Sequence, residues 1–336
     1  MIRRILTGLF LLIQTMIVVA QRGGESLYGI LDVTPSARVA SLGGNQVGLA
    51  GADISMLLNN PAMLSARLSR QASLSYVPYL AGINYAYGGL AWTFENAGNF
   101  SVGLQHVNYG SFVGADESGV KTGDFSAGET IIQLSYSRIL SDRLTAGFSL
   151  KPVMSKIEVY DSWGLVADMG FFYRHPDELL TAGLVWRNFG HQLSVYDAGD
   201  LQSLSGDLQI GVSKKLAHAP FRFSLTAQDL FSGSLTYDSS EDGDGSSDDV
   251  DSFGKKVMRH LRLGLEFVPS ENFYVAAGVN PRRRQELAIE SKTSTVGYSW
   301  GFGLRIYKFN FSYGSSRYHL AGSTNYFSIT TNLSSF

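Results

Sequence analysis

The sequence predicts an all-β fold, a membrane-spanning antiparallel β-barrel of about 14 strands with an N-terminal hatch inside its lumen. Apolar residues alternate with small or polar ones in many segments of about ten residues. The chain is 44% hydrophobic and 12% aromatic but only 17% charged, which is a low charge for a soluble domain of this size. No stretch after residue 20 approaches the length of a spanning helix, so strands must cross the membrane.

Residues 1–20 have the pattern of a cleaved signal peptide. Arg3 and Arg4 form a basic start, residues 5–19 are mostly apolar, and Ala20 ends a run that a signal peptidase would cut. A membrane anchor is the less favoured alternative, because a spanning helix needs about 20 apolar residues. The sequence has no cysteine, so it offers neither a lipoprotein anchor nor disulfides.

The alternation continues along most of the remaining chain. Phe100, Val102 and Leu104 share one side of their segment, and residues 101, 103 and 105 are Ser, Gly and Gln. Backbone groups in hydrocarbon need partners within the protein, so such strands cross only as a closed barrel. The same alternation recurs at 132–137, 144–151, 183–187, 208–213, 221–226, 261–267, 298–305 and 307–314.

A secreted β-sandwich is the alternative, because its strands also alternate apolar and polar residues. A sandwich would carry Lys and Glu on its polar face, whereas Gly, Ser and Thr crowd that face here. Small residues suit a confined interior, and aromatic residues near strand ends suit the two membrane interfaces. The strand-end aromatics are Tyr136, Tyr173, Trp186, Tyr298 and Tyr313.

The connections indicate the orientation of the barrel, which we assign to residues 71–336. Short turns alternate with mostly longer polar stretches, and an even strand count places both barrel ends on the short-turn side, the periplasm. The short turns lie at 95–98, 140–143, 175–178, 217–220, 268–272 and 305–308. The opposite connections lie at 79–82, 108–126, 159–163, 191–204, 231–255, 281–293 and 316–324.

Residues 21–70 precede the barrel and are expected to form the hatch. A barrel of about 14 strands is too wide for its own side chains to fill. We expect residues 27–64 of this segment to start on the periplasmic side, with a short helix at 53–58 capped by Asp53 and ended by Pro61. A flexible periplasmic tail is less favoured, because such tails are usually polar.

Two stretches carry a resemblance. "VTPSARVASLGG" at 33–44 and "DISMLLNNPAML" at 53–64 resemble the hatch of the FadL-like outer-membrane barrels of Bacteroidetes that serve the type IX secretion system, the PorV and PorQ proteins. The compact length and doubled Asn favour PorQ over PorV. The matching residues are Pro35, Ser36, Ala37, Arg38, Gly43, Gly44, Asn59, Asn60, Pro61 and Ala62.

The resemblance implies a non-enzymatic role in the outer membrane. Proteins similar to PorQ hold a surface partner, PorZ, in an attachment complex with PorU and PorV. That complex processes cargo and joins it to lipopolysaccharide. Two alternatives stay open: a FadL-like transporter of hydrophobic molecules, and a PorV-like carrier of cargo sorting domains. A transporter would have an apolar pocket beside the hatch, lined by residues such as Met56, Leu57, Leu58 and Met63.

Several charged residues share the luminal side of their strands. Buried charges must be paired or hydrated, so we expect them to tie the hatch to the wall, with Arg38 pairing one of the acids. An ion or substrate path is the alternative. These residues are Asp168, Arg187, Arg222, Arg262, Glu266 and Arg305.

Two charged clusters fall in expected surface loops. Asp242, Asp244 and Asp248 are spaced loosely like calcium ligands, but the loop pattern is broken, so a solvated mobile loop is favoured over a calcium site. Arg282, Arg283 and Arg284 suit contact with lipid phosphates, and simple solvation or pairing with the acidic loop fits equally well.

Neither a catalytic motif nor a cofactor is expected. The sequence lacks a G-x-S-x-G elbow, an H-E-x-x-H pair and a P-loop. His106 lies on the lipid-facing side, where an interfacial role is favoured. No metal site is expected either, and a net charge of −2 gives no reason to expect nucleic acid.

Overall fold

The computed structural model describes residues 27–49, 51, 53–197, 201–231, 253–287, 295–319 and 322–336. The expected signal peptide and the three aspartates of the acidic loop lie outside these residues. No helix in the described ranges is long and apolar enough to cross a membrane.

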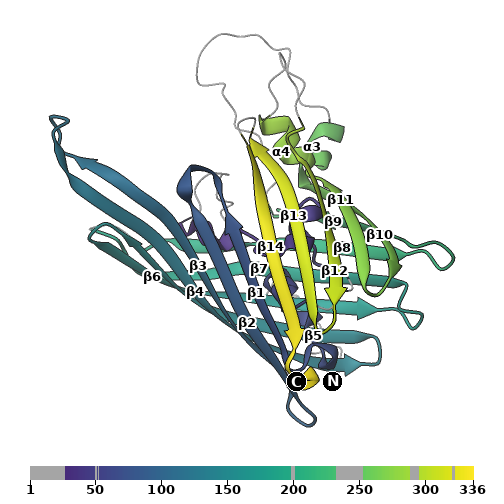
Figure 1. Ribbon diagram of the computed structural model, residues 1–336. Helices are drawn as coiled ribbons and strands as arrows, with labels where there is room; N and C mark the ends of the chain where they lie inside the picture. Colours follow the sequence, from purple (N-terminus) through teal and green to yellow (C-terminus); the bar gives the residue numbers. More distant parts are fainter. Residues whose placement is uncertain are drawn as a thin grey trace.

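Fourteen antiparallel strands form a closed barrel, as predicted (Figure 1). Each strand pairs with its neighbours in sequence, and β1 pairs with β14 to close the wall. The strands are β1 (Gln71–Pro78), β2 (Asn84–Phe94), β3 (Gly98–Ala115), β4 (Lys121–Ser141), β5 (Leu144–Ile157), β6 (Tyr160–Arg174), β7 (Leu180–Ser194), β8 (Ser203–Lys215), β9 (Phe221–Ala227), β10 (Leu261–Ser270), β11 (Phe273–Val279), β12 (Tyr298–Ile306), β13 (Phe309–His319) and β14 (Gly322–Asn332).

The alternation places apolar side chains outside and small or polar ones inside. Leu104 of β3 is 53% exposed on the outer face, whereas Ser101 and Gln105 are buried. An exposed apolar belt of this kind is stable only against hydrocarbon, so the barrel is of the membrane-spanning type. The C-terminus lies at the end opposite the helices α3 (Phe253–His260) and α4 (Pro281–Leu287), on the short-turn side (Figure 1).

Two connections expected as long loops are mainly strand. β3 and β4 continue as a paired ribbon to Ala115 and Lys121, and this hairpin projects well beyond the wall (Figure 1). β13 and β14 likewise stay paired up to His319 and Gly322. Paired strands outside the bilayer need no apolar face, so their sequences lack the regular alternation that predicts a strand.

The wall has one short side. β9 and β11 have seven residues each, whereas β4 has 21. α3 leads directly into β10, and α4 follows β11 after one residue, so both helices stand on the outer edge of this short side.

The hatch fills the lumen as a chain of short helices. They are η1 (Gly29–Asp32), α2 (Ala37–Ser41), η2 (Ile54–Leu58), η3 (Pro61–Met63) and η4 (Ala66–Leu68), and a further short helix, η5 (Leu80–Gly82), joins β1 to β2. The helix at 54–58 is a 3₁₀ helix, and the Asp53 carboxylate caps it by accepting from the Ser55 N–H at 2.9 Å.

The stretch from Leu27, expected to start on the periplasmic side, starts instead in the outer part of the lumen. The Tyr28 hydroxyl lies 2.8 Å from the hydroxyl of Ser162, near the outer end of β6, and the chain descends from there to β1. The expected periplasmic start was wrong, because the strand order determines the side of the membrane only for the residue directly before β1 and not for residues farther back in the chain.

Candidate functional site

The hatch contacts the wall through glycines on the luminal face. A Cβ at Gly278 would overlap the backbone of Leu42 and Gly43, and one at Gly147 would overlap Pro61 and Ala62. Any side chain at these wall positions would push the hatch away, so glycine is needed for close approach. The small residues of the inner face therefore form the seat of the hatch.

The first hatch motif builds the α2 turn and its contacts. Pro35 is buried, and the Ser36 hydroxyl caps α2 by accepting from Val39 N–H at 3.4 Å. The Ala37 N–H donates to the Ser328 hydroxyl at 3.2 Å.

The Gly43-Gly44 pair turns the chain after α2. Both residues have φ near +90°, a conformation that favours glycine. The Gly43 N–H donates to the Ser299 hydroxyl at 2.9 Å, and this hydroxyl in turn donates to the Ser41 carbonyl at 3.0 Å.

The second hatch motif is fixed by Asn60. Its side-chain amide donates to the carbonyls of Val47 and Phe171, at 3.0 and 3.2 Å, and its side-chain oxygen accepts from Ala62 N–H at 2.9 Å. Asn60 therefore joins two parts of the hatch to β6, and Pro61 begins η3 directly after it. Asn59 is buried beside it.

A buried ion cluster joins α2 to the wall. The Arg38 guanidinium donates to both carboxylate oxygens of Glu266 on β10, at 2.7 and 3.0 Å, and Arg222 on β9 donates to the same carboxylate at 3.0 Å. Burial alone would lower the pKa of Arg38, but the Glu266 charge and hydrogen bonds raise it above its usual value. This is the hatch-to-wall pair that the sequence analysis expected.

Of the other luminal charges, Arg187 contacts the hatch directly and Asp168 contacts it indirectly. Arg187 donates to the Asn45 side chain at 3.3 Å, which is a direct link to the hatch. Asp168 is paired within the wall with Lys151 at 2.6 Å, and it also accepts the Asn188 N–H at 2.8 Å. The Asn188 side chain then donates to the Leu31 carbonyl at 3.3 Å, so Asp168 reaches the hatch indirectly.

Arg262 and Arg305 do not tie the hatch to the wall. Arg262 donates to the carbonyls of Arg259 and Leu261, where α3 meets β10. Arg305 is exposed at the periplasmic end. Both lie on the expected side of their strands but near the ends of the barrel, which the alternation alone does not reveal.

Glu129, Lys151 and Asn188 were missed by the sequence analysis. Glu129 on β4 accepts the Ile30 N–H at 2.7 Å and the Tyr109 hydroxyl at 3.1 Å. The available signal was a charged residue at a luminal position of its strand, and both Lys151 and Glu129 fit it. The partner of Glu129 could not be predicted, because it is a backbone N–H and not a side chain of opposite charge.

The hatch core is closely packed. Met56, Leu57, Leu58 and Met63 are between 2% and 7% exposed and belong to one cluster with wall residues such as Phe172. A cavity of about 1,060 Å³ opens on the periplasmic side, and Arg38, Asp53, Arg222 and Arg305 are among its lining residues.

At the outer rim, two of the three adjacent arginines turn toward the barrel. Arg282 pairs with Asp229 at 3.1 Å and with Glu286 at 2.8 Å. The Arg283 guanidinium lies 3.6 Å from the centre of the Tyr318 ring. Arg284 is exposed and lies over the Tyr298 ring on the outer face, 5.0 Å from its centre.

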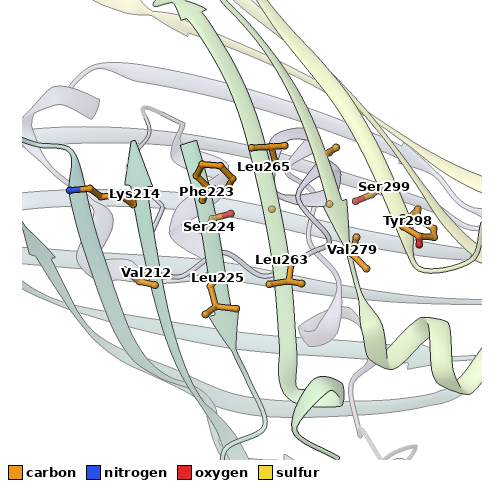
Figure 2. A pocket seen from close by; sticks show the side chains of 13 residues that line it. Val212, Lys214, Phe223, Ser224, Leu225, Leu263, Leu265, Val279, Tyr298 and Ser299 are labelled. Atoms are coloured by element: carbon orange, nitrogen blue, oxygen red, sulfur yellow. The ribbon is translucent and has the colours of Figure 1, made fainter. Parts of the chain in front are cut away.

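A furrow of about 570 Å³ crosses the lipid-facing side of β8–β12 (Figure 2). One of its edges is a row of neighbouring side chains, Val212, Leu225, Leu263, Val279 and Tyr298, from five successive strands. The second edge contains Lys214, Phe223 and Leu265 (Figure 2). The exposed His106 lies elsewhere, on β3, with its ring 2.9 Å from the Thr130 hydroxyl.

In the described ranges, no three His, Asp or Glu side chains are grouped so that they could hold a metal ion.

The comparisons with known proteins concern the fold. No protein-family model matches the chain, and no curated protein matches it. The toluene transporter TodX of Pseudomonas putida is similar in structure, with a TM-score of 0.50 and 11% identity over 90% of this chain and 98% of that chain. A TodX deltaS2 mutant, a monoaromatic hydrocarbon channel, gives 0.52 and 12% over the same shares. A Pseudomonas aeruginosa FadL homologue gives 0.47 and 12%, over 89% and 98%.

The two TodX structures are too distant in sequence to transfer an activity, but their fold agrees with the barrel described above. The chain has the barrel fold of TodX, and it is a multi-pass β-barrel of the cell outer membrane.

Proposed function

We propose that this chain is a non-enzymatic outer-membrane scaffold that anchors a surface protein through its outer rim. By the resemblance of its hatch motifs to PorQ, the partner is a PorZ-like protein, held in one complex with PorU and PorV for cargo processing and attachment to lipopolysaccharide. The observation that carries the proposal is the plugged lumen.

The plug is bonded around much of the circumference. Arg38 binds Glu266 on β10, the Leu64 carbonyl accepts from Ser137 on β4, and the Gly48 carbonyl accepts from Thr181 on β7 at 2.7 Å. Opening a path would separate buried hydrogen-bonded groups, each at a cost of about 1–3 kcal/mol. A rigid, filled barrel suits anchoring better than passage.

The projecting β3–β4 hairpin offers a surface for the partner. Phe112, Val113 and Val120 are 43%, 59% and 62% exposed near its tip, and the Phe112 ring stacks on Phe125 with centres 5.3 Å apart. Apolar side chains on a ribbon that stands away from the bilayer suit protein contact.

Transport of a hydrophobic molecule is the second candidate. The observation that favours it is the shared fold with TodX, whose solved structure is that of a toluene transporter. In this chain, the hatch would have to move for transport, since Met56, Leu57, Leu58 and Met63 leave little room around themselves.

A pull-down from outer membranes tests the scaffold. The tagged full chain should recover a surface protein of the secretion machinery, and Phe112→Ser/Val113→Ser should recover at least tenfold less. Lys121→Gln, on the same hairpin, is the matched control and should behave as wild type. Recovery of no secretion component, with normal cargo attachment after deletion, contradicts the proposal. Toluene uptake into liposomes that contain the wild-type barrel would favour transport instead.

A further inference from the structure

We propose that α3, together with Arg284, is a binding site for the phosphorylated lipid of the outer leaflet, lipid A. The inference depends on the barrel lying in the outer membrane and not on the scaffold role. It starts from the short side of the wall.

The short side is too low to span the apolar layer alone. Seven residues in β9 or β11 rise about 23 Å along the strand, or about 16 Å across a membrane at a tilt of 45°. The apolar band of such barrels is about 25 Å tall. The outer ends of β9 and β11 therefore stop about 9 Å below the outer edge of this band, and α3 and α4 occupy the depth between these strand ends and the lipid headgroups.

α3 has one apolar side and one basic side, as expected for a helix near the lipid headgroups. At 100° per residue, Phe253, Val257 and Met258 fall on one arc of the helix, and Lys255, Lys256, Arg259 and His260 fall on the other. His260 and Arg259 contact the protein, through the Gln228 carbonyl at 2.9 Å and the Gln285 side chain at 2.8 Å. The apolar arc is exposed, with Phe253 at 83%, so no part of the described protein covers it.

The charges around this arc suit an anion at the same depth. Lys255 and Lys256 are exposed on α3, and Arg284 of α4 lies over the lipid-facing Tyr298 ring. Tyr298 also ends the apolar row that borders the furrow across β8–β12 (Figure 2). A phosphate held by these cations would place its acyl chains against Phe253 and along the furrow. Lipid A has both phosphate groups and acyl chains, and it occupies the outer leaflet.

The test measures binding of purified lipid A to the full-length barrel in non-ionic detergent by native mass spectrometry. Each lysine near a membrane surface contributes about 1 kcal/mol, so Lys255→Gln/Lys256→Gln should weaken binding about 30-fold. Lys121→Gln, on the projecting hairpin, should leave it unchanged. Wild type should bind dephosphorylated lipid A about as weakly as the double variant binds lipid A.

Phe253→Ser is a second variant and should also weaken binding, and a heat-modifiability gel checks that each barrel is folded. Equal lipid A affinity for wild type and the double lysine variant would overturn the proposal. So would equal wild-type affinity for the phosphorylated and dephosphorylated lipids, or an equal loss in Lys121→Gln, which would indicate unspecific charge attraction.

Discussion

Replacing Glu266 by glutamine should loosen the hatch without unfolding the barrel. The side chain is 1% exposed and holds Arg38 by two bonds and Arg222 by one. Glutamine keeps the shape but leaves two guanidinium groups facing a neutral amide. The wall itself is closed by strand pairing, so the change acts mainly on hatch docking.

The magnitude follows from the burial of the pair. Removing one partner of a buried ion pair costs about 3–5 kcal/mol. The periplasmic cavity borders Arg38 and Arg222, so water hydrates the remaining cations and the lower end applies. About 3 kcal/mol corresponds to about a 150-fold larger population of the undocked hatch.

Hydrogen exchange of the α2 amides measures this population. The Ala40 and Gly44 N–H groups are bonded within the hatch, to Ser36 and Val39 carbonyls, and should exchange about 150-fold faster in Glu266→Gln. Glu178→Gln, which removes an exposed ion pair with Arg67, is the control and should change exchange less than threefold. Unchanged α2 exchange in Glu266→Gln would refute the idea that this cluster holds the hatch.

The remaining predictions concern the seat and the pH response of the hatch. Gly278→Val should displace the hatch, because the valine side chain would occupy the space of Leu42. Trypsin should then cut the hatch at least tenfold faster. Gly88→Ala is the control and should not change cleavage, because its Cβ would make an ordinary 3.4 Å contact. Burial raises the pKa of Asp53, so the folded hatch holds this proton more tightly than the unfolded chain. Hatch stability from this group is therefore greatest below the ordinary carboxyl pKa and falls as the pH rises through the raised one. Asp53→Asn keeps a cap for η2 and removes that loss, so the protection factors of the hatch amides, which correct for the intrinsic rise of exchange with pH, should no longer fall above the ordinary carboxyl pKa. A variant with the wild-type pH dependence of these protection factors would show that another group is responsible.

The sequence predicts the barrel well because the membrane imposes a rule on every strand. Leu104 faces outward and its neighbour Gln105 faces the lumen, and the alternation of apolar and polar residues predicts both orientations. The Arg38 pair was also predictable, since a cation in a filled lumen needs an acid.

Other features have no local signature. Residues 108–126 pair outside the bilayer, where apolar and polar residues need not alternate, so the sequence of a hairpin there resembles that of a loop. The orientation of α4 is a tertiary outcome: Arg283 stacks on Tyr318, and Arg284 reaches Tyr298, although the two arginines are adjacent in sequence. The Glu129 contact depends on a backbone N–H, which every residue except proline carries.

The course of the hatch constrains how the molecule is assembled. Tyr28 is buried in the outer part of the lumen, and farther along the hatch Leu57 and Leu64 belong to one buried cluster with the wall residue Phe172. The hatch and the wall therefore share their core, so neither part can reach its final packing without the other.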